Sequence, residues 1–143
     1  RGWIRLADNN PGSAPLINPC YLSDDDDLRI LREGVKLARR VFHTKAFARA
    51  YGGDDLPASN VVTDAQIDAD IRQRAESIYH PVGTCRMGED NLSVVDSRLR
   101  VRGVSGLRVA DASVMPILIS GNTNAPSMMI GEKAAGCIIQ DSA

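Results

Sequence analysis

No apolar run in this 143-residue sequence approaches the roughly 18 residues that a membrane-spanning helix needs. An excess of one charge is also missing, because 17 lysines and arginines nearly balance 18 aspartates and glutamates, for a net charge of −1. We therefore expect neither a membrane span nor a nucleic acid as a partner. No signal peptide precedes Arg1, and a chain that opens without methionine is expected to be a piece of a longer protein.

Cysteine is scarce. Cys20, Cys85 and Cys137 are an odd number at wide spacing, and no CxxC pair occurs. This pattern favours neither a zinc site nor a disulfide framework, so we expect no metal. Three buried free thiols in a reducing compartment are the simplest interpretation, which predicts a cytoplasmic location.

Several familiar catalytic and nucleotide-binding motifs are missing too. The sequence has no Walker loop and no GxGxxG fingerprint. Residues 103–107, GVSGL, lack the second glycine of a nucleophile elbow at the required place. The aspartates at 24–27 are typical of a solvated helix start rather than of a catalytic acid pair or a calcium loop. What remains is an ordinary globular composition, 43% hydrophobic and 24% charged, in a chain of one domain's length.

The first part of the sequence predicts a short strand, a long loop and one strong helix. Weak alternation at Trp3–Leu6 indicates the strand, and a proline-rich loop follows it. Ser23 is the expected N-cap of the helix, because the aspartates after it suit the positive end of the helix dipole. His43 lies at the expected C-terminus, and we interpret it as structural. The helix carries an apolar stripe at 3,4,3,4 spacing: Leu28, Leu31, Val35, Ala38 and Phe42.

A second helix is predicted after a polar connection at Tyr51–Asp55. Thr63 and Gln66 have the spacing of a capping box. We expect this helix to end just before Tyr79 and to lead into the segment YHPVGTCRMG, residues 79–88. Its apolar face is formed by Ile67, Ile71, Ala75 and Ile78.

The rest of the sequence predicts two short strands and a buried helix. Leu99 and Val101 alternate with arginines, and Leu107–Ala110 indicates the second strand after a glycine-bearing connection. From Met128 onward the sequence is apolar on most helical faces, so we expect that helix to be mostly buried.

His80 is the first candidate for chemistry, as one of only two histidines. It stands at the expected helix exit, and Pro81 and Gly83 after it indicate a rigid turn with room for a ligand. A lone histidine near a glycine is also typical of a structural residue. The pattern alone leaves both interpretations open.

Asn122 and Asn124 form the second candidate. They lie in a polar loop, Gly121–Pro126, that leads into the apolar helix. An asparagine cap with proline in the first turn is typical of a helix N-terminus. The free N–H groups there also suit an anion or an electron-rich carbonyl, so the two interpretations are compatible.

Three segments together closely resemble the C-terminal region of the glucose-methanol-choline (GMC) oxidoreductases. They are YHPVGTCRMG at 79–88, VVDSRLRVRGVSGLRVADASVMP at 94–116 and SGNTNAPSMMIGEKAA at 120–135. The opening RGWIRL and residues 15–42 are similar to the preceding part of that family, so the resemblance covers nearly the whole chain. It is nearest to bacterial choline- and alcohol-dehydrogenase-like members. The resemblance implies an α+β chain that forms the C-terminal portion of the GMC fold.

The resemblance also implies roles for particular residues. His80 stands at the position of the family's active-site histidine beside the flavin N5, where it would serve as acid and base. Asn122 stands where a second residue, His or Asn, completes the catalytic pair. Positions that match the family's FAD contacts are Asp111 and Ala112, toward the pyrophosphate and ribitol, and Thr123 and Asn124, toward the pyrimidine edge of the flavin.

The missing dinucleotide fingerprint implies that the N-terminal FAD-binding part of the same protein is this chain's partner. Residues 1–85 would belong to the substrate-binding domain and residues 86–143 to the FAD-binding domain. The implied reaction is FAD-dependent oxidation of a small primary alcohol to an aldehyde, by hydride transfer to flavin N5. Two alternatives stay open: an FAD-containing non-redox lyase of the same fold, and a non-catalytic fragment or interaction module.

Overall fold

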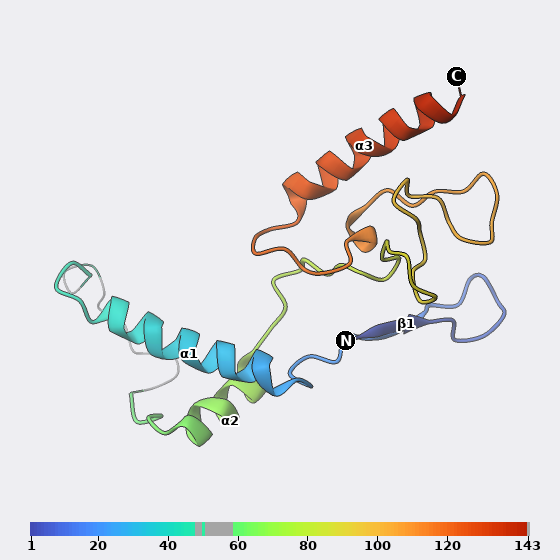
Figure 1. The fold of residues 1–143 in the computed structure, drawn as a ribbon. Helices are drawn as coiled ribbons and strands as arrows, with labels where there is room; N and C mark the ends of the chain where they lie inside the picture. Colours follow the sequence, from blue (N-terminus) through green and yellow to red (C-terminus); the bar gives the residue numbers. More distant parts are fainter. Residues whose placement is uncertain (48–49, 51–58, 143) are drawn as a thin grey trace. The chain divides into compact units, whose positions relative to one another are not determined.

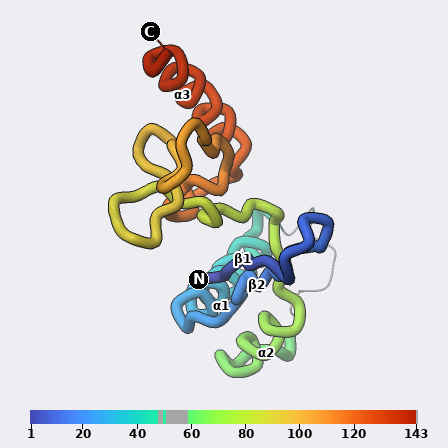
Figure 2. Tube along the Cα trace, turned by 90° about the vertical axis from the view of Figure 1, so that its right-hand side faces the viewer, coloured from blue at the N-terminus to red at the C-terminus, as the bar shows by residue number. Residues whose placement is uncertain are grey.

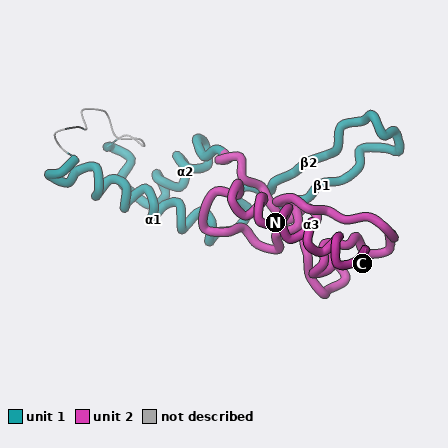
Figure 3. The backbone as a smooth tube through the Cα atoms, turned by 90° about the horizontal axis from the view of Figure 1, so that it is seen from above, with its two compact units in different colours: residues 1–76 teal, residues 77–143 magenta. Residues whose placement is uncertain are grey.

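The computed structural model describes residues 1–47, 50 and 59–142. The chain divides into two compact units, Arg1–Glu76 and Ser77–Ala143 (Figures 1 and 3). Each unit has its own cluster of buried apolar side chains. The expected connection at Tyr51–Asp55 lies outside the described residues. The expected domain boundary after residue 85 stays a prediction, since the two units are defined by contacts alone.

The first unit opens with a two-stranded antiparallel sheet. Strand β1 (Trp3–Arg5) pairs with β2 (Leu16–Asn18), with Trp3 opposite Asn18 (Figure 2). Strand β1 confirms the strand expected there. Strand β2 corrects the predicted loop, since its three residues pair with β1, a contact between distant residues that local sequence does not indicate.

Helix α1 (Asp25–Phe42) confirms the strongest helix prediction. Its N-cap is Asp24 and not Ser23 as expected, because the Asp24 carboxylate accepts a hydrogen bond from the Asp26 N–H at 2.9 Å. The Arg1 guanidinium also donates to Asp24, at 2.9 Å. The acidic first turn suits the positive end of the helix dipole, and Arg1 forms an ion pair with the carboxylate of the N-cap.

His43 is the C-cap of α1, where its N–H donates to the carbonyl of Arg39 at 3.0 Å. This confirms its expected position at the helix C-terminus.

Helix α2 (Asp64–Arg74) packs on α1, and Leu28, Ile67 and Ile71 form the buried cluster between them. An ion pair of 2.8 Å between Arg32 and Asp68 supports the same contact. The apolar stripe expected along α1 is only partly covered, because most of its residues are not buried. Helix α2 has 11 residues against 18 in α1, so at about 1.5 Å per residue it covers only part of the longer helix.

The capping box of α2 is confirmed. Thr63 Oγ1 accepts from the Gln66 N–H at 3.2 Å, and Gln66 Oε1 accepts from the Thr63 N–H at 3.0 Å. The predicted end before Tyr79 is wrong, since the helix stops at Arg74. Ile78 is 74% exposed, so little apolar burial is available at this position to favour a longer helix.

The second unit is built from turns around one buried cluster. Its members come from distant parts of the sequence: Val95, Leu99, Val114, Met115, Ile130 and Ala134. The two strands expected between Val94 and Ala110 are not formed, and only isolated bridges such as Val95 to Val101 occur there. Asp96 explains the difference, because its Oδ1 accepts from the N–H groups of Arg98 and Arg100, which a strand would pair elsewhere.

Helix α3 (Asn124–Ser142) follows the short 3₁₀ turn η1 (Ala112–Val114) and lies beside the turns of its unit (Figures 1 and 2). The helix confirms the prediction, but its expected burial is wrong. Only Ile130 and Ala134 are buried, because one side of α3 packs on the core cluster while Ile139 is 70% exposed on another.

The three cysteines are free, as expected, but each is half-buried rather than buried. Within the described residues, no helix combines the length and apolar character that crossing a membrane requires.

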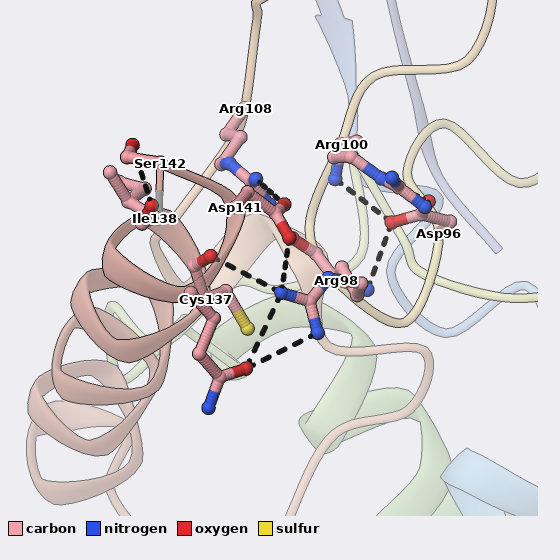
Figure 4. A network of polar contacts seen from close by, with 9 residues as sticks. Asp96, Arg98, Arg100, Arg108, Cys137, Ile138, Asp141 and Ser142 are labelled. Carbon is pink, nitrogen blue, oxygen red and sulfur yellow. Dashed lines mark hydrogen bonds and ion pairs between the residues drawn. The ribbon is translucent and has the colours of Figure 1, made fainter.

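Two arginines hold the C-terminal end of α3 (Figure 4). Arg98 donates to the Asp141 carboxylate at 2.6 Å and to the Cys137 carbonyl at 3.2 Å. Arg108 donates to the other oxygen of Asp141. The hydrogen bonds from Arg108, and next those from Arg98, lower the pKa of the Asp141 carboxyl. The arginines supply the positive charge that the last turn of α3 itself lacks.

Asp141→Asn is expected to lower the midpoint of thermal unfolding at pH 7. Because the pKa of Asp141 is lowered in the folded state, its ionised carboxylate stabilises that state. This stabilisation is complete above the ordinary aspartate pKa of about 3.9, and it disappears as the pH falls through the lowered pKa. The difference from wild type should therefore vanish in strong acid. Glu132→Gln is the control, since Glu132 lies exposed on the same helix without an ion pair among the described residues. An unfolding midpoint of Asp141→Asn that lies below that of the wild type by the same amount at every pH would contradict the stabilising role of the ionised carboxylate.

Candidate active site

The segment that carries His80 is fixed to η1 by its backbone. The N–H of Cys85 donates to the carbonyl of Ser113 at 3.0 Å, and the N–H of Met87 donates to the carbonyl of Val114 at 2.8 Å. Val114 is fully buried in the core cluster. The histidine segment therefore has a fixed register against the centre of its unit.

Gly83 makes the turn after His80 possible. Its φ of +89° is a conformation that residues with a side chain rarely adopt. A Cβ at this position would also lie 3.4 Å from the Met115 carbonyl oxygen. That distance is ordinary van der Waals contact, so the positive φ, and not crowding, is what favours glycine in the turn that the sequence predicts here.

His80 contacts Thr123 at the start of α3. The Nδ1 atom of His80 lies 2.9 Å from the hydroxyl oxygen of Thr123 and 3.4 Å from its backbone nitrogen. His80 is half-buried, whereas Thr123 is 7% exposed. The second ring nitrogen, Nε2, has no hydrogen bond to any described residue, so it is available to a substrate.

The main chain of Thr123 is itself fixed by the first turn of α3. Its carbonyl accepts from the N–H of Ser127 at 3.0 Å and from the Ser127 hydroxyl at 2.6 Å. Helix α3 in turn contacts η1, on which the histidine segment is paired. Two segments that lie 43 residues apart in the sequence thus meet at the His80 imidazole.

Among the described residues, no hydrogen bond joins His80 to Asn122, the expected catalytic pair, so the pair stays a prediction. Asn122 is exposed and, among the described residues, its amide forms no hydrogen bond. The hydrogen-bond partner of His80 is instead Thr123, the residue that follows Asn122. For Thr123 the family resemblance implies only a contact with FAD. Nothing in the sequence indicates the contact between His80 and Thr123, because it depends on how α3 is placed on η1.

The other predicted cofactor residues lie on the two elements that contact each other, η1 and α3. Asp111 is the exposed N-cap of η1, and its carboxylate accepts from the Ser113 N–H at 2.8 Å. Ala112 is half-buried and packs on the core cluster. Asn124 is the exposed first residue of α3. Their roles toward FAD stay predictions.

The N-terminus of α3 fits an electron-rich group. Its first turn contains no acidic residue, so no side-chain carboxylate of that turn neutralises the positive end of the helix dipole. Pro126 in the first turn lacks an N–H, which leaves fewer donors to satisfy there. Asn124 and Asn122 add exposed amides at the same end.

The surface hollows and the clusters of possible metal ligands do not point to another site among the described residues. Two surface hollows of this unit are lined by residues 96–108 and by part of α3, and neither includes His80. Across residues 1–47, 50 and 59–142, no three His, Cys, Asp or Glu side chains gather as a metal site would require.

Comparison with known proteins agrees with the segments noted in the sequence. The family model described as GMC oxidoreductase, for the C-terminal domain, matches residues 1–131. An alcohol dehydrogenase [acceptor] of Pseudomonas putida is 51% identical over 140 residues, which are 98% of this chain and 25% of the relative. The mitochondrial choline dehydrogenase of Homo sapiens is 48% identical over 139 residues, 96% of this chain and 23% of the relative. The chain thus spans about a quarter of the length of these curated relatives.

A solved structure shares the fold. A formate oxidase of Aspergillus oryzae RIB40, studied for its FAD modification, matches with a TM-score of 0.89 and 29% identity. The match covers 98% of this chain and 25% of the oxidase chain. The expected fold, the C-terminal portion of an α+β architecture, is confirmed.

Gly83→Ala is expected to destabilise the unit by more than about 1 kcal/mol, because alanine is strained at this positive φ. Thermal unfolding of the protein that carries this chain tests the effect. Gly131→Ala is the matched control, since a Cβ there meets nothing within 4 Å and alanine favours the helix. Equal midpoints for Gly83→Ala and the wild type would show that the turn tolerates a side chain.

Proposed function

Because the chain belongs to the GMC oxidoreductase family, we propose that its protein oxidises a primary alcohol to an aldehyde, with FAD as the cofactor. The observation that carries the proposal is the His80 imidazole, held at Nδ1 by Thr123 and free at Nε2. A histidine anchored at one nitrogen and open at the other is suited to acid and base catalysis. The similarity to an alcohol dehydrogenase and a choline dehydrogenase supports an alcohol as the substrate.

His80 accepts the proton of the substrate hydroxyl at Nε2. Loss of this proton makes the oxygen alkoxide-like and assists departure of a hydride from the adjacent carbon. FAD, when bound, supplies the hydride acceptor at its N5 atom. The half-buried setting of His80 limits the access of water to the reacting groups.

Asn122 orients the substrate oxygen. Its exposed amide lies next in the chain to Thr123, the contact of His80. We assign to it a hydrogen bond that keeps the alkoxide-like oxygen in register with His80. An amide can do this without itself changing protonation.

Asp111, Ala112, Thr123 and Asn124 would hold the FAD. The α3 N-terminus, without an acidic residue in its first turn, suits the negative charge of the reduced flavin. The remaining contacts would come from the N-terminal FAD-binding part of the same protein, which is the expected partner of this chain. We assign residues 1–85 to the substrate-binding domain and residues 86–143 to the FAD-binding domain. The free thiols of the three cysteines favour a cytoplasmic location.

His80→Ala in the complete, FAD-loaded protein is expected to slow anaerobic flavin reduction by the alcohol by roughly 10²–10⁴, the scale of a lost general base. FAD should remain bound.

His43→Ala is the matched control, since the only other histidine caps α1. It should lower the unfolding midpoint slightly and leave the rate of flavin reduction unchanged. Normal reduction by the His80 variant, or a dead His43 variant, would refute the proposed function.

Asn122→Ala should slow flavin reduction by roughly 10²–10³, by analogy with the loss of a hydrogen-bond donor to a developing oxyanion. Asn122→His should retain more activity, because the imidazole can also bind the substrate oxygen. Stopped-flow measurement of flavin absorbance compares the two variants. If Asn122→Ala reduces flavin at the wild-type rate and only its thermal stability falls, Asn122 is a structural residue of the helix start.

A further inference from the structure

Two groups of Thr123 face the same ring nitrogen of His80 and have opposite requirements. The backbone N–H can only donate, so its contact of 3.4 Å needs an unprotonated Nδ1. The hydroxyl oxygen, at 2.9 Å, can either donate to Nδ1 or accept from an Nδ1–H. The protonation of Nδ1 therefore depends on which of the two contacts dominates.

The chemistry assigned to His80 requires one of these states. Nε2 can accept a proton only when neutral His80 carries its own proton on Nδ1. An Nδ1–H in a half-buried position needs an acceptor, and the Thr123 hydroxyl is the acceptor that the described residues offer. At 2.9 Å the hydroxyl contact has the usual length of a hydrogen bond, whereas the hydrogen bond from the backbone N–H is long, at 3.4 Å, and therefore the weaker of the two.

From this geometry we propose that Thr123 is a positioning residue, which sets the tautomer of His80 by accepting the Nδ1 proton at its hydroxyl oxygen. The proposal rests on the proposed function, in which His80 Nε2 accepts the proton of the alcohol. Thr123 then acts on the reaction through His80, apart from any contact that it makes with FAD.

The same hydroxyl stabilises the product of proton transfer. After Nε2 gains the alcohol proton, the imidazolium donates from both ring nitrogens. The Nδ1–H donor is then charged, and a charged donor strengthens the hydrogen bond to Oγ1. The backbone N–H would oppose this state, because two donors would face each other.

Neither water nor a shift of the main chain can easily supply another acceptor in place of the Thr123 hydroxyl. Thr123 is 7% exposed, so water has little access to its side chain. Its carbonyl is fixed by both hydrogen bonds from Ser127. Loss of the hydroxyl would leave the backbone N–H as the only Thr123 group at Nδ1, which favours the proton on Nε2 and blocks the base.

Three variants of the complete, FAD-loaded protein separate this role from a structural one. Thr123→Val keeps the shape and the backbone N–H but removes the hydroxyl, and should slow anaerobic flavin reduction roughly 10- to 100-fold, the scale for partners that orient a histidine. Thr123→Ser restores the hydroxyl and should restore the rate. Ser127→Ala is the matched control, because it removes a hydrogen bond to Thr123 without touching His80, and should leave the rate near that of the wild type.

A second measurement reports the tautomer without turnover. In ¹⁵N NMR of histidine-labelled protein, with the His80 signals assigned by their loss in His80→Ala, wild-type neutral His80 should show a protonated Nδ1. Thr123→Val should show the proton moved to Nε2, and Thr123→Ser should resemble the wild type. A neutral wild-type His80 protonated on Nε2 would overturn the proposal by itself, even where a variant fails to fold.

The outcomes distinguish this inference from the proposed function. Normal flavin reduction by His80→Ala would refute the function on which the inference depends. Slow reduction by His80→Ala together with a normal rate for Thr123→Val would overturn only the positioning role. A slow Thr123→Val with an unchanged tautomer would also overturn it, because the hydroxyl would then act by another route.

Discussion

The candidate site depends on two backbone hydrogen bonds, from Cys85 to Ser113 and from Met87 to Val114. They attach the histidine segment to the turn η1, whose last residue is fully buried. Because α3 also contacts η1, this short turn is the common support of both halves of the site. The arrangement gives His80 a fixed partner although the unit contains no extended sheet among its described residues.

Local chemistry in the sequence predicts where helices begin better than where they end. The capping box at Thr63 and Gln66 is readable because both of its hydrogen bonds form within four residues. The end of α2 is not readable in this way, since it depends on whether Ile78 finds an apolar partner. A similar limit applies at β2, a strand of three residues that exists through its pairing with β1.

Apolar periodicity has a different limit. It shows that a helix has an apolar face but not which element covers that face or how far the cover extends. Along α1 the contact with the shorter α2 buries Leu28, while Leu31 remains 43% exposed. In α3 the core cluster covers the side that contains Ile130 and Ala134 and leaves Ile139 exposed. Burial along both helices therefore follows the length and placement of their partners.

The resemblance to a family and the geometry of the chain give different kinds of information about the site. Resemblance identifies His80 as the position for acid and base chemistry, but it does not show which ring nitrogen holds the proton. That question turns on a difference between two distances, 2.9 Å to the Thr123 hydroxyl and 3.4 Å to its N–H. A hydroxyl can exchange the roles of donor and acceptor, whereas a backbone amide cannot. Thr123 can therefore serve both the neutral base and the imidazolium, and this is a physical reason for a hydroxyl beside His80.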